Sequence, residues 1–196
     1  MRNRYRSSIP VWILLAINVA VFIATAARPD IGNYLAMTKP ITDSHYWTIL
    51  STMFLHASFA HIFFNMLNLY FLGTFCLQLV ERKWFLLIYF IGGIVGNLMF
   101  LAIGPMYSAA VGASGAIFAL GGLLAVMRPK LRILFYFFIP MPLWLGITIA
   151  FVLTAFVAGI AWQAHLGGII VGLIVGFILR RRERQRYQQS SYYRWR

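Results

Sequence analysis

Acidic residues and cysteine are both rare in this chain of 196 residues. It has four Asp and Glu residues against 17 Lys and Arg residues, which gives a formal net charge of +13. The single Cys76 excludes a disulfide within the chain and any cysteine cluster that would bind a metal ion. The carboxylates are spread along the chain, as Asp30, Asp43, Glu81 and Glu183. Few residues are therefore available for catalysis by paired carboxylates.

Charge of either sign is also missing from long parts of the chain. Hydrophobic residues make up 61% of the sequence and aromatic residues 17%, which exceeds the usual share in soluble domains. Apolar runs that approach the length of a membrane span cover residues 10–27, 61–80, 84–104, 114–127, 143–159 and 164–179. The sequence therefore predicts an all-α polytopic membrane protein, a bundle of six transmembrane helices with a short central fourth helix.

The basic residues flank the apolar runs and do not form the patch that nucleic-acid binding would need. Six spans place both termini on one side, and that side then holds 15 of the 17 basic residues, with only Arg28 and Lys39 opposite. This distribution agrees with the excess of positive charge in cytoplasmic segments of membrane proteins. We therefore expect the lipid bilayer as the partner of these charges, with a basic N-terminus (1–9) and a basic tail (180–196) in the cytoplasm.

The longest stretch between two spans, residues 28–60, is not simply polar. It contains many large apolar side chains together with Tyr46 and Trp47. Tyrosine and tryptophan are enriched where the membrane meets water. We expect this loop to lie in or against the outer membrane interface.

Polar side chains from three of the predicted helices are expected at one depth. Ser114 begins a helix of 14 residues that ends at a basic residue, which places it about 21 Å from the inner surface. The same rise per residue places His165 at about 22 Å and Asn65 at about 24 Å. A hydrocarbon core is about 30 Å thick, so the three side chains lie below the outer surface in a common layer.

This layer contains the groups that serine-based hydrolysis needs. Ser114 is a candidate nucleophile and His165 a candidate general base. The backbone N–H of Ser114 at a helix N-terminus, with His61 and Asn65 one turn apart on a shared helix face, could stabilise an oxyanion. Because every carboxylate is predicted outside the layer, the sequence indicates a Ser-His dyad and not a triad.

Small residues on two predicted helices favour close contact between them. Gly168, Gly172 and Gly176 are spaced by four residues on the sixth helix, and Gly115 lies on the fourth. Such ridges allow membrane helices to approach closely. Close approach would bring Ser114 within reach of His165.

Other functions are less consistent with the sequence. A paired-aspartate protease needs two intramembrane carboxylates, and a His-Glu-x-x-His metalloprotease needs a motif that this chain lacks. A zinc site built from His56, His61 and His165 is conceivable but has no carboxylate nearby to orient its ligands. A transporter would show paired repeats or intramembrane charges. We expect no metal and no cofactor.

Less specific interpretations of the polar residues also exist. Taken alone, Ser114 is typical of helix packing, and His165 could equally form an interhelical hydrogen bond. Their occurrence with His61 and Asn65 in one layer of the membrane favours a functional site.

Three separated motifs resemble the rhomboid family of intramembrane serine proteases. They are His-Ala-Ser-Phe-Ala-His-Ile-Phe-Phe-Asn at 56–65, Gly-Ala-Ser-Gly at 112–115, and His165 followed by Gly168 and Gly172. The resemblance spans nearly the whole chain and is strongest to the minimal six-helix bacterial or archaeal form. It implies one rhomboid membrane domain over residues 1–196, in the plasma membrane of a prokaryote.

The resemblance also implies roles for individual residues. Ser114 would be the nucleophile that forms an acyl-enzyme and His165 its base, with His61, Asn65 and the Ser114 N–H around the oxyanion. The residues implied to support them are His56, Gly112, Gly115, Phe118, Gly168 and Gly172. Two positions depart from the common pattern: Phe118 replaces a tyrosine but can still stack on the base, and Thr48 replaces an arginine that follows the loop tryptophan in many relatives.

The implied substrates are single-span membrane proteins, cut near the outer end of their transmembrane helix. The fifth helix would be the lateral gate through which they enter. The alternative is a non-catalytic rhomboid-like protein that binds membrane helices. Such relatives typically lose the serine or the histidine, and this chain has both. The oligomeric state is not indicated by the sequence.

Overall fold

Long apolar helices dominate the computed structural model, which describes residues 7–135, 138–157 and 159–194. Within these residues, four helices are long and apolar enough to cross a membrane: α1 (Ile9–Ala27), α5 (Phe59–Leu79), α6 (Arg82–Ile103) and the first part of α9 (Trp162–Arg194). Two shorter apolar helices, α7 (Ser114–Met127) and α8 (Leu143–Ala155), accompany them. The prediction of a polytopic helical bundle is confirmed.

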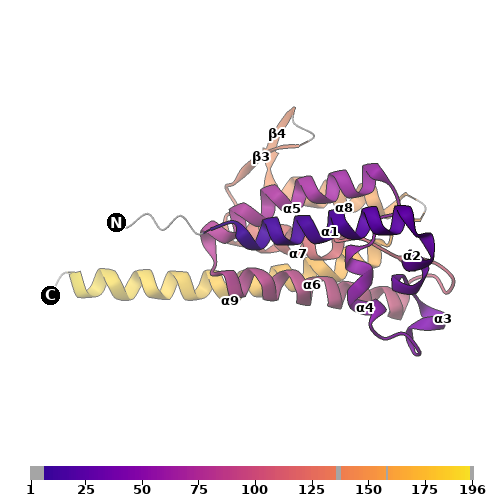
Figure 1. Ribbon diagram of the computed structural model, residues 1–196. Coiled ribbons are helices and arrows are strands. Elements are labelled where there is room, and N and C mark those ends of the chain that lie inside the picture. The colour runs from indigo at the N-terminus through magenta and orange to yellow at the C-terminus, as the bar shows by residue number, and fades with distance from the viewer. Residues whose placement is uncertain (1–6, 136–137, 158, 195–196) are drawn as a thin grey trace.

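The short helix α7 lies at the centre of this bundle. Of its 14 residues, 12 are buried, as expected for a helix that is apolar on all sides. It packs against α5, α6, α8 and α9, and Figure 1 shows it enclosed by the longer helices. Its bounds are those predicted, and its first residue is Ser114.

The backbones of α7 and α9 are in close contact. A Cβ atom added to Gly168 would lie 2.0 Å from the carbonyl oxygen of Gly115, and one added to Gly172 would lie 2.1 Å from that of Ala119. Both distances are far below any van der Waals contact, so only glycine fits at these two positions of α9. The glycine ridge therefore brings the two helices together as the sequence suggested.

The segment between α1 and α5 contains more regular structure than a loop. Its elements, in order, are α2 (Pro29–Leu35), β1 (Met37–Thr38), α3 (Lys39–Thr42), α4 (Thr48–Ser51) and the 3-10 turn η1 (Thr52–Phe54). Hydrogen bonds hold it in place: Ser51 Oγ donates to the Leu35 carbonyl at 2.9 Å, and Asn97 Nδ2 of α6 donates to the Ile49 carbonyl at 2.7 Å. The predicted outer loop is thus folded onto the bundle.

Two antiparallel strand pairs depart from a purely helical fold. β1 pairs with β2 (Ala109–Ala110), which joins the loop to the segment that precedes α7. β3 (Arg132–Phe135) pairs with β4 (Ile139–Pro142) between α7 and α8. Figure 1 shows this second hairpin projecting sideways from the bundle. Apolar runs reveal spans, but they do not reveal such short pairings.

Two helices end at other residues than the membrane spans predicted for them. α8 ends at Ala155 and not at 159, and the chain then turns through Gly159, whose φ of +82° lies in the left-handed region. α9 does not stop at 179 but continues to Arg194, since arginine and glutamine are good helix formers in water. Figure 1 shows this extension leaving the bundle.

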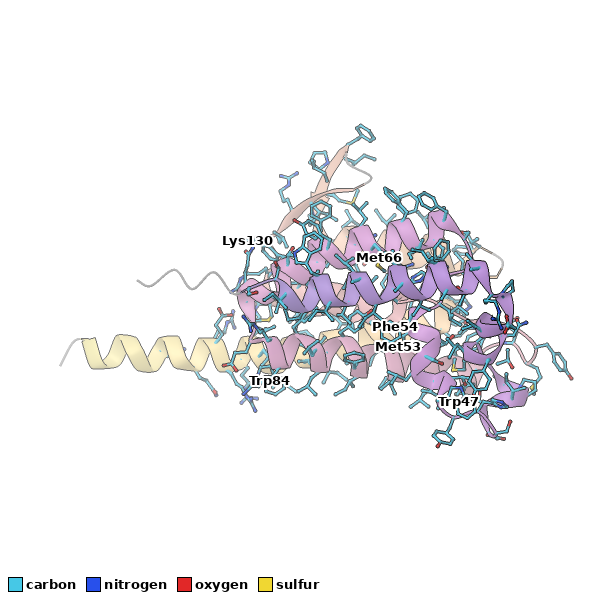
Figure 2. All side chains as sticks on the ribbon, in the orientation of Figure 1. Trp47, Met53, Phe54, Met66, Trp84 and Lys130 are labelled. Carbon is cyan, nitrogen blue, oxygen red and sulfur yellow. The ribbon has the colours of Figure 1, made fainter. Side chains whose placement is uncertain are left out.

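The two ends of the bundle differ in their residues. We call the end with α2, α3 and α4 the outer end, and the end from which α9 extends the inner end, after the predicted topology (Figure 1). Figure 2 shows Trp47 at the outer end, and Trp84 and Lys130 at the inner end. The basic residues that flank the spans thus gather where the extension of α9 begins.

Candidate active site

Ser114 and His165 are in direct contact at the outer half of the bundle. The distance from Ser114 Oγ to His165 Nε2 is 2.8 Å, within the range of a hydrogen bond. Ser114 is the first residue of α7, and His165 lies in the first turn of α9. The close glycine packing of these two helices brings together side chains that are 51 residues apart in the sequence.

Two further side chains hold the imidazole ring of His165. Phe118, one turn below Ser114, stacks on it with ring centroids 4.5 Å apart and an angle of 30° between the planes. Thr154 of α8 lies on the other side, with Oγ1 at 3.1 Å from Nδ1. The ring is 4% exposed, so protein groups fix its orientation.

Sequence reasoning did not identify Thr154. A threonine in an apolar helix usually bonds to a carbonyl of its own helix, so its presence gives no signal of a contact with another helix. Its depth along the helix could have indicated that it lies near the dyad. Thr154 is 11 residues from the start of α8, or about 17 Å by the helical rise, which is near the level of the dyad.

His61 and Asn65 lie on the first turns of α5. Ser58 caps this helix by accepting a hydrogen bond from the His61 N–H at 3.1 Å, and this cap starts the helix two residues before the predicted position. Asn65 is 7% exposed and donates one amide hydrogen to the His61 carbonyl at 2.8 Å. Its second amide hydrogen remains for another acceptor.

The ring of His61 borders the backbone that leads into Ser114. Its Nδ1 accepts a long hydrogen bond from the Ala57 N–H at 3.4 Å, which leaves the proton of the neutral ring on Nε2. A Cβ atom added to Gly112 would lie 2.8 Å from that Nε2. His61 therefore directs an N–H donor toward the segment just before the serine. His56 packs edge-on against His61, with centroids 5.0 Å apart.

Thr52 fixes the same segment and was also missed by the sequence reasoning. Gly112 has a φ of +117°, a backbone conformation that residues with a side chain rarely adopt. Its N–H donates to the Thr52 carbonyl at 2.9 Å. The Thr52 hydroxyl also donates to the Ala110 carbonyl. Thr52 thus anchors the backbone before Ser114 to the outer segment, in addition to the strand pair β1 and β2.

Trp47 and Thr48 are both fixed within the outer segment. The Trp47 indole N–H donates to the Tyr34 carbonyl at 3.3 Å. Thr48, which stands where many relatives have arginine, is fully buried and bonds to the His45 carbonyl at 2.6 Å. Trp47 and Thr48 are therefore both held by neutral hydrogen bonds within the segment.

The ion pairs that the carboxylates form lie away from this site. Asp30 pairs with Arg28 at the outer end, and this guanidinium lowers the pKa of Asp30. The other pairs lie at the inner end, between Glu81 and Lys83 and between Glu183 and Arg128. Across the described parts of the chain, no three His, Cys, Asp or Glu side chains are grouped as a metal site requires. The three-histidine alternative therefore gains no support from the geometry.

Comparison with known proteins identifies the family. The Rhomboid domain family matches residues 43–182. The chain belongs to the rhomboid family. This rhomboid is similar to mitochondrial Rhomboid protein 1 of Saccharomyces cerevisiae, with 29% identity over 92% of the chain and 57% of the yeast protein. It is similar to Rhomboid protease GluP of Bacillus subtilis, with 33% identity over 71% of the chain and 27% of GluP.

A third relative is RHOMBOID-like protein 2 of Arabidopsis thaliana, 32% identical over 74% of the chain and 46% of that protein. The chain thus covers less than two thirds of the length of each of these three relatives. Rhomboid family members are generally intramembrane serine proteases. Membership also agrees with the apolar helices in identifying an integral membrane protein.

Proposed function

We propose that this rhomboid is an intramembrane serine endopeptidase with Ser114 as nucleophile and His165 as general base. The observation that carries the proposal is the 2.8 Å contact between Ser114 Oγ and His165 Nε2. A histidine within hydrogen-bonding distance of a serine hydroxyl can take its proton as the oxygen attacks a carbonyl. The stacking of Phe118 keeps the base in place through that step.

The reaction would proceed in two stages. In the first, Ser114 Oγ adds to the scissile carbonyl and Nε2 takes its proton. The oxyanion then meets the Ser114 N–H at the start of α7, His61 Nε2–H and the free amide hydrogen of Asn65. Collapse releases the amine, which takes the proton from His165, and leaves an acyl-enzyme. In the second stage, water deprotonated by His165 hydrolyses that ester and restores Ser114.

The depth of the dyad suggests the class of substrate. From Ser114 to the inner end of α7 is about 21 Å, so a substrate would be cut in the outer part of its transmembrane helix. A helical backbone hides its carbonyls in hydrogen bonds and must unwind locally before one can reach Ser114. The proposed substrates are therefore single-span membrane proteins, cleaved near their outer end.

The proposal includes an arrangement in the membrane. The whole chain, 1–196, would form one rhomboid domain, with residues 28–60 in the outer interface. The basic segments 1–9 and 180–196 would lie in the cytoplasm of a prokaryote. The excess of basic residues at the inner end supports this orientation.

Cleavage of a reporter in liposomes tests the dyad. Ser114→Ala and, separately, His165→Ala should each abolish cleavage of a fluorescent single-span reporter that is reconstituted with the enzyme. Ser108→Ala is the matched control, because Ser108 is exposed in the connection before β2. It should cleave as the wild type does. Undiminished cleavage by the Ser114 or the His165 variant would contradict the dyad.

The second candidate, a non-catalytic protein that binds membrane helices, makes a different prediction. A protein that only binds membrane helices does not need a reactive serine, whereas in this chain Ser114 and His165 are both present and in contact. A fluorophosphonate probe should label the wild type and not Ser114→Ala. Absence of labelling from both proteins would favour the non-catalytic alternative.

A further inference from the structure

The hydroxyl oxygen of Thr154 lies within hydrogen-bonding distance of two groups. This atom, Oγ1, is 2.9 Å from the Phe151 carbonyl oxygen in its own helix and 3.1 Å from His165 Nδ1. We propose that Thr154 is a positioning residue, which fixes the tautomer of His165 and makes the base dependent on the position of α8. The inference rests on the proposed protease function.

The first step is a count of protons. A hydroxyl has one hydrogen to donate, and a carbonyl oxygen has none. The short distance to the Phe151 oxygen favours a Thr154 hydrogen that lies between these two oxygens, since otherwise their lone pairs would face each other. Thr154 Oγ1 can then only accept a hydrogen bond from the imidazole. His165 must carry its proton on Nδ1.

The second step concerns the other ring nitrogen. A neutral imidazole with its proton on Nδ1 has a free lone pair on Nε2. That lone pair faces Ser114 Oγ at 2.8 Å. The opposite tautomer would direct an N–H at the serine oxygen and leave no base for its proton. Thr154 thus holds His165 in the form that can act, a task that an aspartate performs in Ser-His-Asp triads.

The third step concerns the helix that carries Thr154. The buried residues of α8, Leu143 and Gly146, both lie near its inner end. Toward the outer end the helix is open to its surroundings, with Leu153 50% exposed and Phe156, just after the helix, 86% exposed. Among the hydrogen bonds of the described residues, the bond to His165 is the one that joins a side chain of α8 to another helix. Outward movement of this end would therefore remove the acceptor from Nδ1.

Removal of the hydroxyl tests the role directly. Thr154→Val keeps the shape of the side chain and removes the acceptor, while Thr154→Ser keeps the acceptor. The matched control is Thr148→Val on the same helix, because the Thr148 hydroxyl is exposed and bonds only to the Trp144 carbonyl, at 2.9 Å. Cleavage of the reporter in liposomes gives kcat and KM, and 15N NMR of ring-labelled histidine gives the tautomer, with the His165 signal identified by its loss in His165→Ala.

We expect Thr154→Val to lower kcat about 3- to 10-fold, the range that follows from the net worth of one neutral hydrogen bond. KM should change by less than about twofold, since the hydroxyl does not touch substrate in this role. In Thr154→Val, the NMR signal of His165 should show the Nε2–H tautomer. Thr154→Ser should restore both kcat and the Nδ1–H tautomer, and Thr148→Val should resemble the wild type.

Several outcomes would overturn the inference. Wild-type kcat in Thr154→Val is one, and an unchanged Nδ1–H tautomer is another. If Thr154→Val does not fold, as judged by thermal unfolding in detergent, Thr154→Ala is measured instead by the same two criteria. The proposed function is judged separately: cleavage by Ser114→Ala would refute the protease, whereas an inactive Ser114→Ala with a fully active Thr154→Val would refute only the role of Thr154.

Discussion

The helices α7 and α9 are joined at both ends, but by different chemistry. At the outer end Ser114 and His165 share one hydrogen bond between neutral groups. At the inner end Arg128 forms two bonds with the Glu183 carboxylate, at 3.0 and 2.9 Å, and Arg180 donates to the Val126 carbonyl at 3.0 Å. Charged groups are costly within a bilayer. The ion pair at the inner end is partly exposed, whereas the outer contact joins groups that can exchange a proton.

Between these ends the glycines of α9 set the distance between the two helices. We expect Gly168→Ala to have the largest effect, about 3 kcal/mol of destabilisation, because its Cβ would meet the backbone of Gly115. Cleavage should be lost with it. Gly176→Ala is the control nearer the inner end, where a Cβ would first meet the Val126 side chain at 2.9 Å. It should cost about 1 kcal/mol.

Thermal unfolding in detergent and cleavage in liposomes measure these two variants. Equal losses of stability would show that the packing is equally tight along the whole contact. A stable and active Gly168→Ala would show that the outer contact does not depend on backbone approach. Either result would contradict the distinction between the two ends that the Cβ distances at Gly168 and Gly176 suggest.

The outer end also depends on the segment that leads into α7. Thr52→Val should lower the free energy of unfolding by about 2 kcal/mol, since it removes the Thr52 hydroxyl that donates to the buried Ala110 carbonyl. It should also slow cleavage, because Thr52 holds the backbone before Ser114. Thr25→Val is the control, since the Thr25 hydroxyl bonds at 3.0 Å to the Val21 carbonyl in its own helix. Equal effects of both variants on cleavage would exclude a specific role for Thr52.

The sequence allowed prediction of what depends on regular geometry. Helical rise and the positions of basic residues predicted that Ser114, His165 and Asn65 lie at one depth, and the structure brings the first two into contact. Glycine spacing was enough to indicate that two helices meet. The threonines were missed for a physical reason: a hydroxyl in an apolar helix can bond to its own backbone or to a neighbour, and only the three-dimensional arrangement decides. Thr52 and Thr154 belong to this group.

The remaining differences have two causes. α8 and α9 end at other residues than the predicted spans because hydropathy locates the membrane boundary and not the end of a helix. α9 continues through a basic segment that the membrane would exclude, because its residues favour a helix in water. The strands β1 and β2 were missed because a pair of two residues leaves no periodic pattern.

The smallest effect is expected for the ion pair at the inner end. Arg128 and Glu183 have side chains 36% and 51% exposed, so solvent screens their attraction. A double-mutant cycle of Arg128→Gln and Glu183→Gln should give a coupling of about 0.5 kcal/mol, reduced further by salt. Arg128 also donates to the Met127 carbonyl at 2.8 Å, and both the single and the double variant with Arg128→Gln lose this bond. The cycle subtracts that loss and leaves the coupling between the two side chains.

Cleavage should change by less than about twofold in both single variants, since an exposed pair of this strength has little leverage on a dyad at the far end of the helices. Arg182→Gln, which removes an exposed charge next to Glu183, controls for the overall charge of α9. A loss of cleavage as large as that of Thr52→Val, absent from Arg182→Gln, would mean that the inner ion pair sets the position of α9 and so reaches His165. The neutral outer contact would then depend on the charged inner one.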